Sequence, residues 1–300
     1  MNHLIVDGFG LVFKSFYAFN SLMTSTGIQS GCVYGFLCGM RSLKKKYPAF
    51  HITVAWDNEA KRKKEIFPEY KAFRPQHSVS DYITDLKKIL KAVNVTQAEV
   101  PGEEADDVIA SLVHQYSSEG LVYVYSADKD MLQLVRDGKV IVIRPKTGGQ
   151  PDQFYDEEAV RQEFGVAPRD LACFLAFRGD KVDNIPGVAR VPSKIISNLV
   201  NQYKSPEAVY NSGSINALTE FQKTSFYRHK EQSKVNYTIV HLRENLSCEM
   251  TEGAPNSSEV DIVLSKYEIR SMTVNSLIAA FEDKEFMERN APAIENYSLF

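Results

Sequence analysis

Acidic side chains are the residues of this sequence most able to do chemistry, because they gather in three short clusters at 103–107, 128–130 and 180–183. The first cluster places four carboxylates within five residues. Carboxylates this close repel one another unless a cation lies among them, and oxygen-only ligands suit Mg²⁺ and Mn²⁺. The first cluster alone is equally typical of a helix N-terminus, where acids complement the helix dipole. That alternative does not account for the other two clusters.

The elements that must position these acids are predicted by the hydrophobic pattern. Three short segments rich in β-branched and aromatic residues are typical of buried strands: Leu4–Val6, Ile52–Trp56 and Val122–Tyr125. They lead into Asp7, Asp57 and Asp128, with helical patterns between them over Ser80–Val93 and from Glu103 onward. This alternation predicts a parallel sheet with helices on both faces. Because the carboxyl ends of such strands share one edge, we expect the aspartates to meet there beside the start of the Glu104 helix. Any one of them alone could instead cap a turn or a helix.

Composition narrows the classes of function. Three hundred residues, 44% of them hydrophobic, allow one large domain or two small ones. We see no signal peptide and no apolar segment of membrane length, and expect a cytoplasmic protein with four free thiols. The six histidines have no zinc-site spacing. Although the net charge is −3, the runs 44–46 and 61–64 are strongly basic. Such runs are most often solvated, or else they contact phosphate. An acidic centre ringed by basic segments suits a metal-dependent phosphodiesterase.

Six segments, found in one order, carry a resemblance to a known family: 4–8, 33–37, 70–75, 104–107, 128–130 and 179–187. Together they resemble the 5′-nuclease family, which includes the 5′→3′ exonuclease domain of bacterial DNA polymerase I and the free-standing phage flap endonucleases. The resemblance covers about residues 1–285. It implies a PIN-like, Rossmann-like α/β nuclease core over residues 1–165, with a helical arch at about 70–95. A helical domain of the helix-hairpin-helix type would follow over 166–285, and a tail over 286–300.

The resemblance also implies functional residues. Two divalent metal ions, Mg²⁺ or Mn²⁺, would be held by a set of nine carboxylates: Asp7, Asp57, Glu104, Asp106, Asp107, Asp128, Asp130, Asp180 and Asp183. Lys71 and Arg74 match the catalytic cations at the base of the family's arch, and Lys14 stands where the family usually has arginine. Lysine keeps that charge but lacks the bidentate fork. Within the arch, Tyr70 could stack on unpaired bases or belong to the core, and Lys87 and Lys88 are further candidates for DNA contact.

The predicted hairpin departs from the family pattern. Gly187 is retained, but the next two expected glycines are Arg190 and Pro192. Proline has no N–H to offer a phosphate, so we expect the side chains of Arg190 and Lys194 to replace backbone contacts to duplex DNA. The family binds K⁺ at this element, which would place that ion near Gly187.

The implied activity is hydrolysis of DNA phosphodiester bonds at 5′ ends and flap junctions, and also on RNA–DNA hybrids, by a monomer acting in primer removal or repair. Two alternatives are a ribonuclease of the related PIN-like class and a non-catalytic flap-binding protein. The last five residues, 296–300, resemble peptides that dock onto the bacterial sliding clamp. The alternative for this tail is packing on the protein's own surface or fraying. Phage and bacterial origins both remain open.

Overall fold

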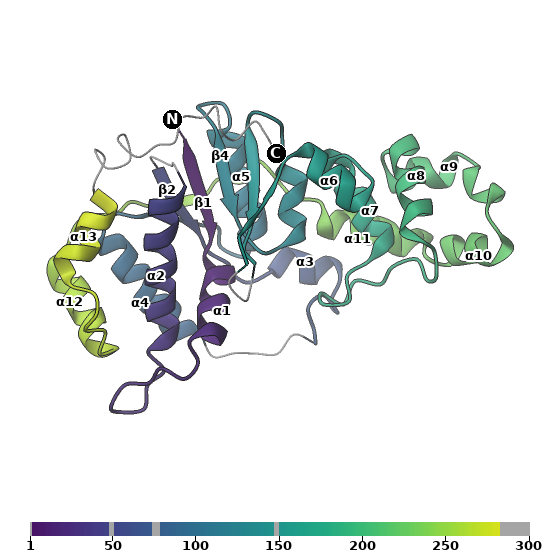
Figure 1. The fold of residues 1–300 in the computed structure, drawn as a ribbon. Coiled ribbons are helices and arrows are strands. Elements are labelled where there is room, and N and C mark those ends of the chain that lie inside the picture. Colours follow the sequence, from purple (N-terminus) through teal and green to yellow (C-terminus); the bar gives the residue numbers. More distant parts are fainter. Residues whose placement is uncertain (1, 48–50, 74–78, 147–149, 283–300) are drawn as a thin grey trace.

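Strands and helices alternate through the first half of the chain, as Figure 1 shows. The computed structural model describes residues 2–47, 51–73, 79–146 and 150–282. Over these residues the strands are β1 His3–Asp7, β2 His51–Ala55, β3 Thr96–Glu99, β4 Val122–Tyr125, β5 Val140–Arg144, β6 Gln153–Tyr155 and β7 Glu249–Thr251. The three strands predicted from the sequence are therefore confirmed as β1, β2 and β4.

Helices make up most of the remainder. The first group precedes residue 165: α1 Gly8–Ala18, α2 Gly31–Lys46, α3 Lys61–Ile66, α4 Ser80–Ala92, α5 Ala105–Tyr116 and α6 Glu157–Phe164. The second group follows: α7 Leu171–Arg178, α8 Ser193–Tyr203, α9 Pro206–Asn211, α10 Glu220–Arg228, α11 Lys230–Val240, α12 Ser257–Lys266 and α13 Val274–Glu282. Short 3₁₀ helices are η1 Lys129–Leu134, η2 Pro168–Asp170 and η3 Ser214–Ala217.

The strands form one seven-stranded sheet in the order β6-β5-β4-β1-β2-β3-β7. The five inner strands are parallel, as the sequence predicted. The two edge strands differ, since β6 and β7 pair antiparallel with their neighbours. Both are three residues long. The short connection from β5 to β6 returns the chain directly beside β5, which produces an antiparallel pair.

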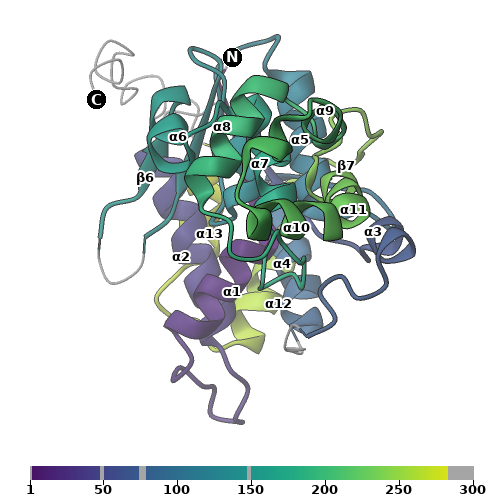
Figure 2. The ribbon, with the colours of Figure 1, turned by 90° about the vertical axis from the view of Figure 1, so that its right-hand side faces the viewer.

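The sheet is covered on both faces because its strands are apolar on both sides. Leu4 and Val6 of β1 belong to one buried cluster and Ile5 to the other, the alternation expected of a strand. The first cluster includes side chains of α1, α2, α4, α12 and α13, and the second includes side chains of α5, α6 and α7. Figure 1 shows these groups on opposite sides of β1, and Figure 2 looks at the helical end formed by α7 to α11.

Helix α4 corrects the predicted arch. The arch was expected over about residues 70–95, but Leu86, Ile89 and Leu90 of α4 are fully buried in the cluster that covers the sheet. Its apolar face makes α4 a core helix packed against α12. Only the stretch before α4 is left to form an arch, and residues 74–78, including Arg74, lie outside the described part of the chain.

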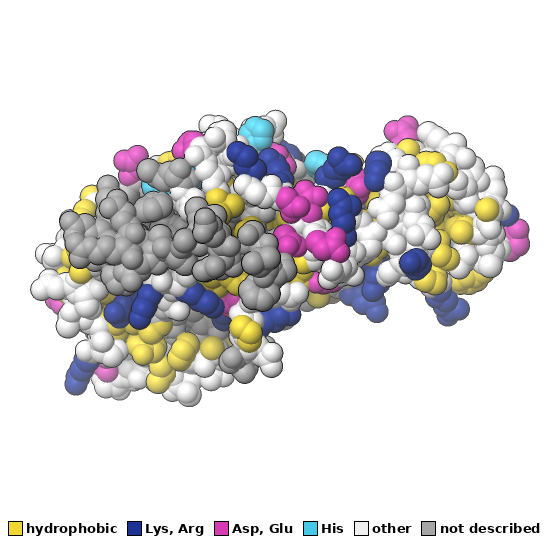
Figure 3. Space-filling model, turned by 45° about the horizontal axis from the view of Figure 1, so that its top comes forward, with side chains coloured by type: hydrophobic (Ala, Val, Ile, Leu, Met, Phe, Trp, Pro, Cys, Tyr) yellow, Lys and Arg dark blue, Asp and Glu magenta, His cyan; other side chains and the backbone are white. Residues whose placement is uncertain are grey.

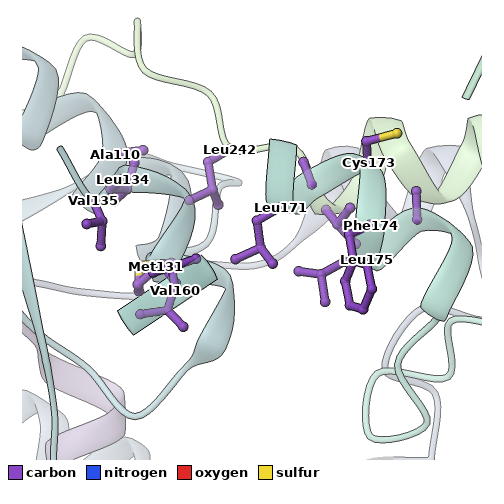
Figure 4. Close-up of a cluster of buried hydrophobic side chains, with 14 of the residues drawn as sticks. Ala110, Met131, Leu134, Val135, Val160, Leu171, Cys173, Phe174, Leu175 and Leu242 are labelled. Carbon is purple, nitrogen blue, oxygen red and sulfur yellow. The ribbon is translucent and has the colours of Figure 1, made fainter. Parts of the chain in front are cut away.

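A continuous apolar core joins the two parts of the molecule. Figure 4 shows Met131 of η1 and Val160 of α6 beside Leu171, Phe174 and Leu175 of α7. All five side chains are buried members of one cluster. Because this packing is shared, the loop that follows α7 is held in a fixed position relative to the carboxyl ends of the strands.

The surface does not carry one sign of charge. On the face seen in Figure 3, acidic and basic side chains lie side by side between the broad part of the molecule and its narrower helical end. Over the described residues, none of the helices combines the length and the apolar character needed to cross a membrane.

Candidate active site

Three aspartates lie together at the carboxyl ends of β4, β1 and β2. Asp7 ends β1 and caps α1, where its Oδ1 accepts the N–H of Gly10 at 2.8 Å. Asp57 follows β2 and accepts the N–H of Ala105 at 2.7 Å, and Asp128 caps η1. Asp7 and Asp128 therefore perform the local capping role that the sequence left open as an alternative, whereas Asp57 accepts the N–H of a residue on a distant helix, α5. All three nevertheless line one cleft, because their strands are neighbours in the sheet.

This acid cleft has a volume of about 390 Å³ and draws its walls from both halves of the chain. Six carboxylates line it: Asp7, Asp57, Asp106, Asp128, Asp180 and Asp183. The last two belong to the loop after α7, so the third acidic cluster of the sequence meets the first two here. Lys71, Lys129 and Arg144 contribute the basic side chains of the lining.

The acids that line the cleft, and Asp130 beside it, are held in an unfavourable electrostatic environment. Burial raises the pKa of the Asp57 carboxyl to about 7, and nearby Asp7 adds to the rise. Burial and Asp128 raise the pKa of Asp130 to about 7 as well, and the pKa of Asp7 and Asp106 is also raised, mainly by burial. A cation among these groups would favour their charged forms. They are therefore suited to bind one.

Asp130 gives a second indication that a cation belongs here. Its Oδ1 is buried and accepts no hydrogen bond, and the Lys129 ammonium lies 3.4 Å away. In the described part of the chain, no three acidic, histidine or cysteine side chains already converge on one point. Lysines instead separate the carboxylates. The donor set is right for a hard divalent ion, and the side chains must move to close around one.

Glu104 does not line the cleft but lies behind it, at the N-cap of α5. Its Oε1 contacts the ammonium of Lys71, and its Oε2 lies 2.8 Å from that of Lys63. The hydroxyl of Tyr70 donates to Oε2 at 3.0 Å. Burial alone would raise the pKa of Glu104, but the two lysines outweigh burial and lower it to about 2. Glu104 is thus a buried anion with three donors.

Asp107 corrects the predicted set of metal ligands. Its side chain is fully buried, and its Oδ1 accepts the backbone N–H of Arg243 at 2.9 Å. Its Oδ2 faces Arg62 at 3.5 Å and Lys63 at 3.9 Å. Successive residues of a helix point about 100° apart, and here Asp106 lines the cleft while Asp107 points toward the backbone of Arg243. Asp107 anchors the loop near Arg243 and does not reach the cleft.

Tyr70 fits the second of its two alternatives, a place in the core, and Lys14 lies beside the acid cleft and not in its lining. The Tyr70 side chain is only 3% exposed, so it cannot stack on a base. Its role in the structure is to hold Glu104. Lys14 donates to the hydroxyl of Tyr125 at 3.0 Å and lines a neighbouring, larger cavity between α1, α2 and the β5–β6 connection. That cavity borders the acid cleft, with which it shares Asp7 and Phe13.

Lys71 lies where the predicted role requires it, on the rim of the acid cleft. Its backbone has a positive φ of 55°, a conformation that a residue with a side chain adopts at a cost. Its N–H donates to the carbonyl of Asp183 at 3.0 Å, and Asn184 donates to the carbonyl of Glu69 at 2.9 Å. These bonds tie the segment carrying Lys71 to the loop after α7.

The loop between α7 and α8 forms the predicted hairpin. A β-carbon on Gly187 would lie 2.2 Å from the carbonyl oxygen of Arg178, so only glycine fits there. Arg190 replaces an expected glycine and adopts a left-handed conformation, with φ of 56°. Its guanidinium lies 5.8 Å from the ring centre of Phe221. Pro192 caps α8 and precedes the exposed Lys194. Arginine therefore occupies a left-handed backbone position that favours glycine.

The remaining predicted DNA contacts lie away from the acid cleft. Lys87 is 2.6 Å from Glu99, and Lys88 is 3.8 Å from Asp85. Both lysines border a separate small pocket beside β3. The structure therefore does not bring them to the other candidate residues, and their DNA-binding role stays a prediction.

Two lysines of the site were not recognised from the sequence. Lys63 belongs to the basic run at 61–64, for which the sequence predicts a solvated or phosphate-contacting surface, yet its side chain is only 4% exposed and faces Glu104. Lys129 stands between Asp128 and Asp130 in the sequence, and its side chain contacts Asp180. That spacing was a signal, because a lysine inside an acidic cluster has carboxylates within reach.

Comparisons with known proteins agree with this architecture. A family model described as the N-terminal resolvase-like domain of 5′-3′ exonucleases matches residues 2–165. A second model, described as the C-terminal SAM fold of 5′-3′ exonucleases, matches residues 166–261. The first matched segment contains the strands β1 to β6, and the second contains most of the helical part together with β7.

Individual relatives and solved structures lead to the same family. A 5′-3′ exonuclease of Aquifex aeolicus is 36% identical over 278 residues, which cover 91% of this chain and 93% of the relative. DNA polymerase I of Pseudomonas aeruginosa is 30% identical over 94% of this chain and 30% of its own length. The bacteriophage T5 D15 flap endonuclease, solved as a pseudo-enzyme-product complex with DNA and metal ions, superposes with a TM-score of 0.65. Its sequence identity is 19%, and the match covers 96% of this chain and all of that one. The chain belongs to the 5′-3′ exonuclease family.

Proposed function

We propose that this protein hydrolyses DNA phosphodiester bonds at 5′ ends and at flap junctions. The observation that carries the proposal is the acid cleft, where six aspartates from the sheet edge, α5 and the hairpin meet beside Lys71. Carboxylates that the fold gathers from such distant parts of the sequence repel one another, so they need a shared cation to offset their charge. A chain of the 5′-3′ exonuclease family with this cleft is best explained as an active nuclease.

The cleft would hold two divalent cations, Mg²⁺ or Mn²⁺. Asp7, Asp57 and Asp106 would hold or orient one cation, and Asp128, Asp130, Asp180 and Asp183 the other. Bound there, the cations would supply a hydroxide nucleophile and stabilise the leaving 3′-oxygen. The raised pKa of Asp57 and the buried, donor-free Oδ1 of Asp130 support this assignment.

The chain's own cations would act on the phosphate. Lys71 stands on the cleft rim with its backbone fixed by Asp183 and its ammonium against Glu104. An ammonium at that place offsets the negative charge that the phosphate gains as it reacts. Glu104 would orient Lys71 and would enter the cation site only if the lysine moved away. Arg74 would assist, as the resemblance implies.

The hairpin would hold the duplex beside the cleft. Arg190 lies in the turn before α8 and Lys194 in the first turn of that helix, and both are exposed close to where backbone N–H groups would otherwise be offered to phosphate. Such contacts position a duplex without reading its sequence. K⁺ near Gly187 would contribute to the same grip. The T5 complex, which contains DNA, supports this use of the fold.

Further partners are part of the proposal. The protein would act as a monomer in the cytoplasm of a bacterial cell, on RNA–DNA hybrids as well as on DNA, during primer removal or repair. The possible clamp-binding tail, residues 296–300, lies outside the described residues. A competition experiment with a peptide of residues 291–300 on a bacterial sliding clamp would test it. Failure to displace a known clamp ligand would end that part of the proposal.

The test of the function is a substrate panel with Mg²⁺. Five labelled substrates separate the alternatives: a 5′ flap, a nicked duplex, a 3′ flap, an RNA-primed duplex and single-stranded RNA. We expect cleavage of the 5′ flap near its junction and stepwise release from the nick, with the 3′ flap intact. Cleavage of single-stranded RNA alone would favour the PIN-like ribonuclease. Tight flap binding without cleavage in Mg²⁺ or Mn²⁺ would favour the non-catalytic protein.

A further inference from the structure

Lys129 lies inside the acid cleft, and the proposed hydrolysis gives it no role. Its ammonium contacts Oδ2 of Asp180 and lies 3.4 Å from Oδ1 of Asp130. The side chain is 30% exposed, so it borders both the cleft and the core. The first residue of η1 thus reaches across to the hairpin.

Asp130 and Asp180, the two carboxylates that Lys129 contacts, depend on its positive charge. Oδ1 of Asp180 accepts the N–H of Val182 at 2.7 Å, while Oδ2 has the Lys129 ammonium as its partner. The buried Oδ1 of Asp130 accepts no hydrogen bond. Asp130 belongs to η1 and Asp180 to the hairpin after α7, so the lysine also connects two separate elements. Its removal would leave like charges facing each other across this gap.

We propose that Lys129 is a positioning residue that holds Asp130 and Asp180 together and competes with a divalent cation for them. The inference rests on the proposed function, because it requires these carboxylates to be cation ligands. An ammonium is a compact charge on a flexible four-carbon stem. It can therefore occupy the place between two carboxylates and withdraw when a stronger cation takes that place. Lys129 thereby lowers the affinity of the site for the cation while keeping the hairpin against η1.

Cation affinity, measured without DNA, tests the competition directly. Titration calorimetry with Mn²⁺ would compare the parent with Lys129→Met, Lys129→Arg and Lys181→Met. Two cations should bind in two steps of different affinity. Because Lys129→Met removes the competing charge, the dissociation constant of the weaker Mn²⁺-binding step should fall roughly three- to tenfold, the range of a partly buried ion pair. Lys129→Arg should remain near the parent, because it keeps the competing charge.

Lys181→Met is the matched control, since Lys181 is an exposed lysine beside Asp180 and its loss changes the net charge equally. Screening limits the effect of such a surface charge, so we expect a change of less than about twofold. Equal Mn²⁺ affinity in Lys129→Met and the parent, or an equal gain in both methionine variants, would overturn the proposal.

A second measurement uses the parent protein and does not depend on the variants folding. A small amine-reactive acetylating reagent should modify Lys129 slowly in chelator. In Mg²⁺ the ratio of the acetylation rate of Lys129 to that of Lys181 should rise. An unchanged ratio would overturn the proposal. If the parent binds no Mn²⁺, the proposed function fails together with this inference. If Mn²⁺ binds in two steps that Lys129 does not affect, the inference alone fails.

Discussion

Replacing Lys63 by methionine should destabilise the protein, although Lys63 stands in a basic run that looks like a solvated surface. Its side chain is 4% exposed, and its ammonium lies 2.8 Å from Glu104 and 3.9 Å from Asp107. Methionine has a similar length and can fill the space. The change therefore removes the charge while leaving most of the packing, and two buried carboxylates lose a partner.

The size of the loss follows from the Glu104 carboxyl. A fall in its pKa from 4.5 to about 2 corresponds to about 3 kcal/mol of stability at neutral pH. Lys63 and Lys71 share that amount, and Lys71 remains in the variant. Because Asp107 also loses a neighbour, we expect the free energy of unfolding to fall by about 2 kcal/mol.

The pH dependence has a definite sign. The pKa of Glu104 is lower in the folded protein than in the unfolded chain, so its contribution is present above about pH 4.5 and is lost as the pH falls toward 2. The stability difference between parent and variant should therefore be full at pH 7 and shrink near pH 3.

Urea unfolding at both pH values measures this difference. Lys64→Met is the control, because Lys64 is the next residue of α3 and is exposed. A surface change of this kind should stay within about 0.5 kcal/mol of the parent. If the two variants lose the same stability, or if the Lys63→Met difference does not shrink in acid, the role given to Lys63 is wrong.

Three further changes test other parts of the site. Lys71→Ala should lower kcat much more than it raises KM, because its charge matters most in the transition state; a raised KM with unchanged kcat would contradict this. Arg190→Ala keeps a β-carbon at the same φ, and it should lower the slope of log duplex affinity against log salt concentration by about 1. Equal slopes for the variant and the parent would refute the phosphate contact. Gly187→Ala should cost about 1–3 kcal/mol or more, because its β-carbon would meet the Arg178 carbonyl; unchanged thermal unfolding would disprove that tight approach.

The sheet edge could be predicted from the sequence because it depends on short, local signals. Each inner strand that carries an acid is a run of apolar residues followed by aspartate, and parallel topology then brings Asp7, Asp57 and Asp128 together. The edge strands β6 and β7 carry no comparable signal, since each has only three residues. The direction of β6 follows from its short connection to β5, whereas β7 pairs with β3, which lies far earlier in the chain, so its direction depends on tertiary structure.

The direction of individual side chains could not be predicted. Asp106 and Asp107 are adjacent acids of one motif, but the helix turns one to the cleft and the other to the backbone of Arg243. Likewise, Tyr70 lies within a DNA-binding motif and is buried against Glu104. Such choices depend on which distant element packs against the helix, and a composition pattern does not contain that information. Conversely, Arg190 adopts the positive φ that favours glycine, although it carries a side chain.

The central claim is that the acid cleft binds the cations that cleave DNA, and one measurement tests it most directly. A 5′-labelled flap is incubated with the parent, Asp128→Ala or Asp81→Ala, in Mg²⁺ and in chelator, and product length and flap binding are read together. Asp81 is exposed and lies on α4, so its variant controls for loss of an acid elsewhere. We predict that cleavage near the junction requires Mg²⁺, persists in Asp81→Ala and disappears in Asp128→Ala. Flap binding in chelator should persist in Asp128→Ala, since a lost carboxylate does not weaken contacts to phosphate. Substantial Mg²⁺-dependent cleavage by Asp128→Ala would contradict the claim.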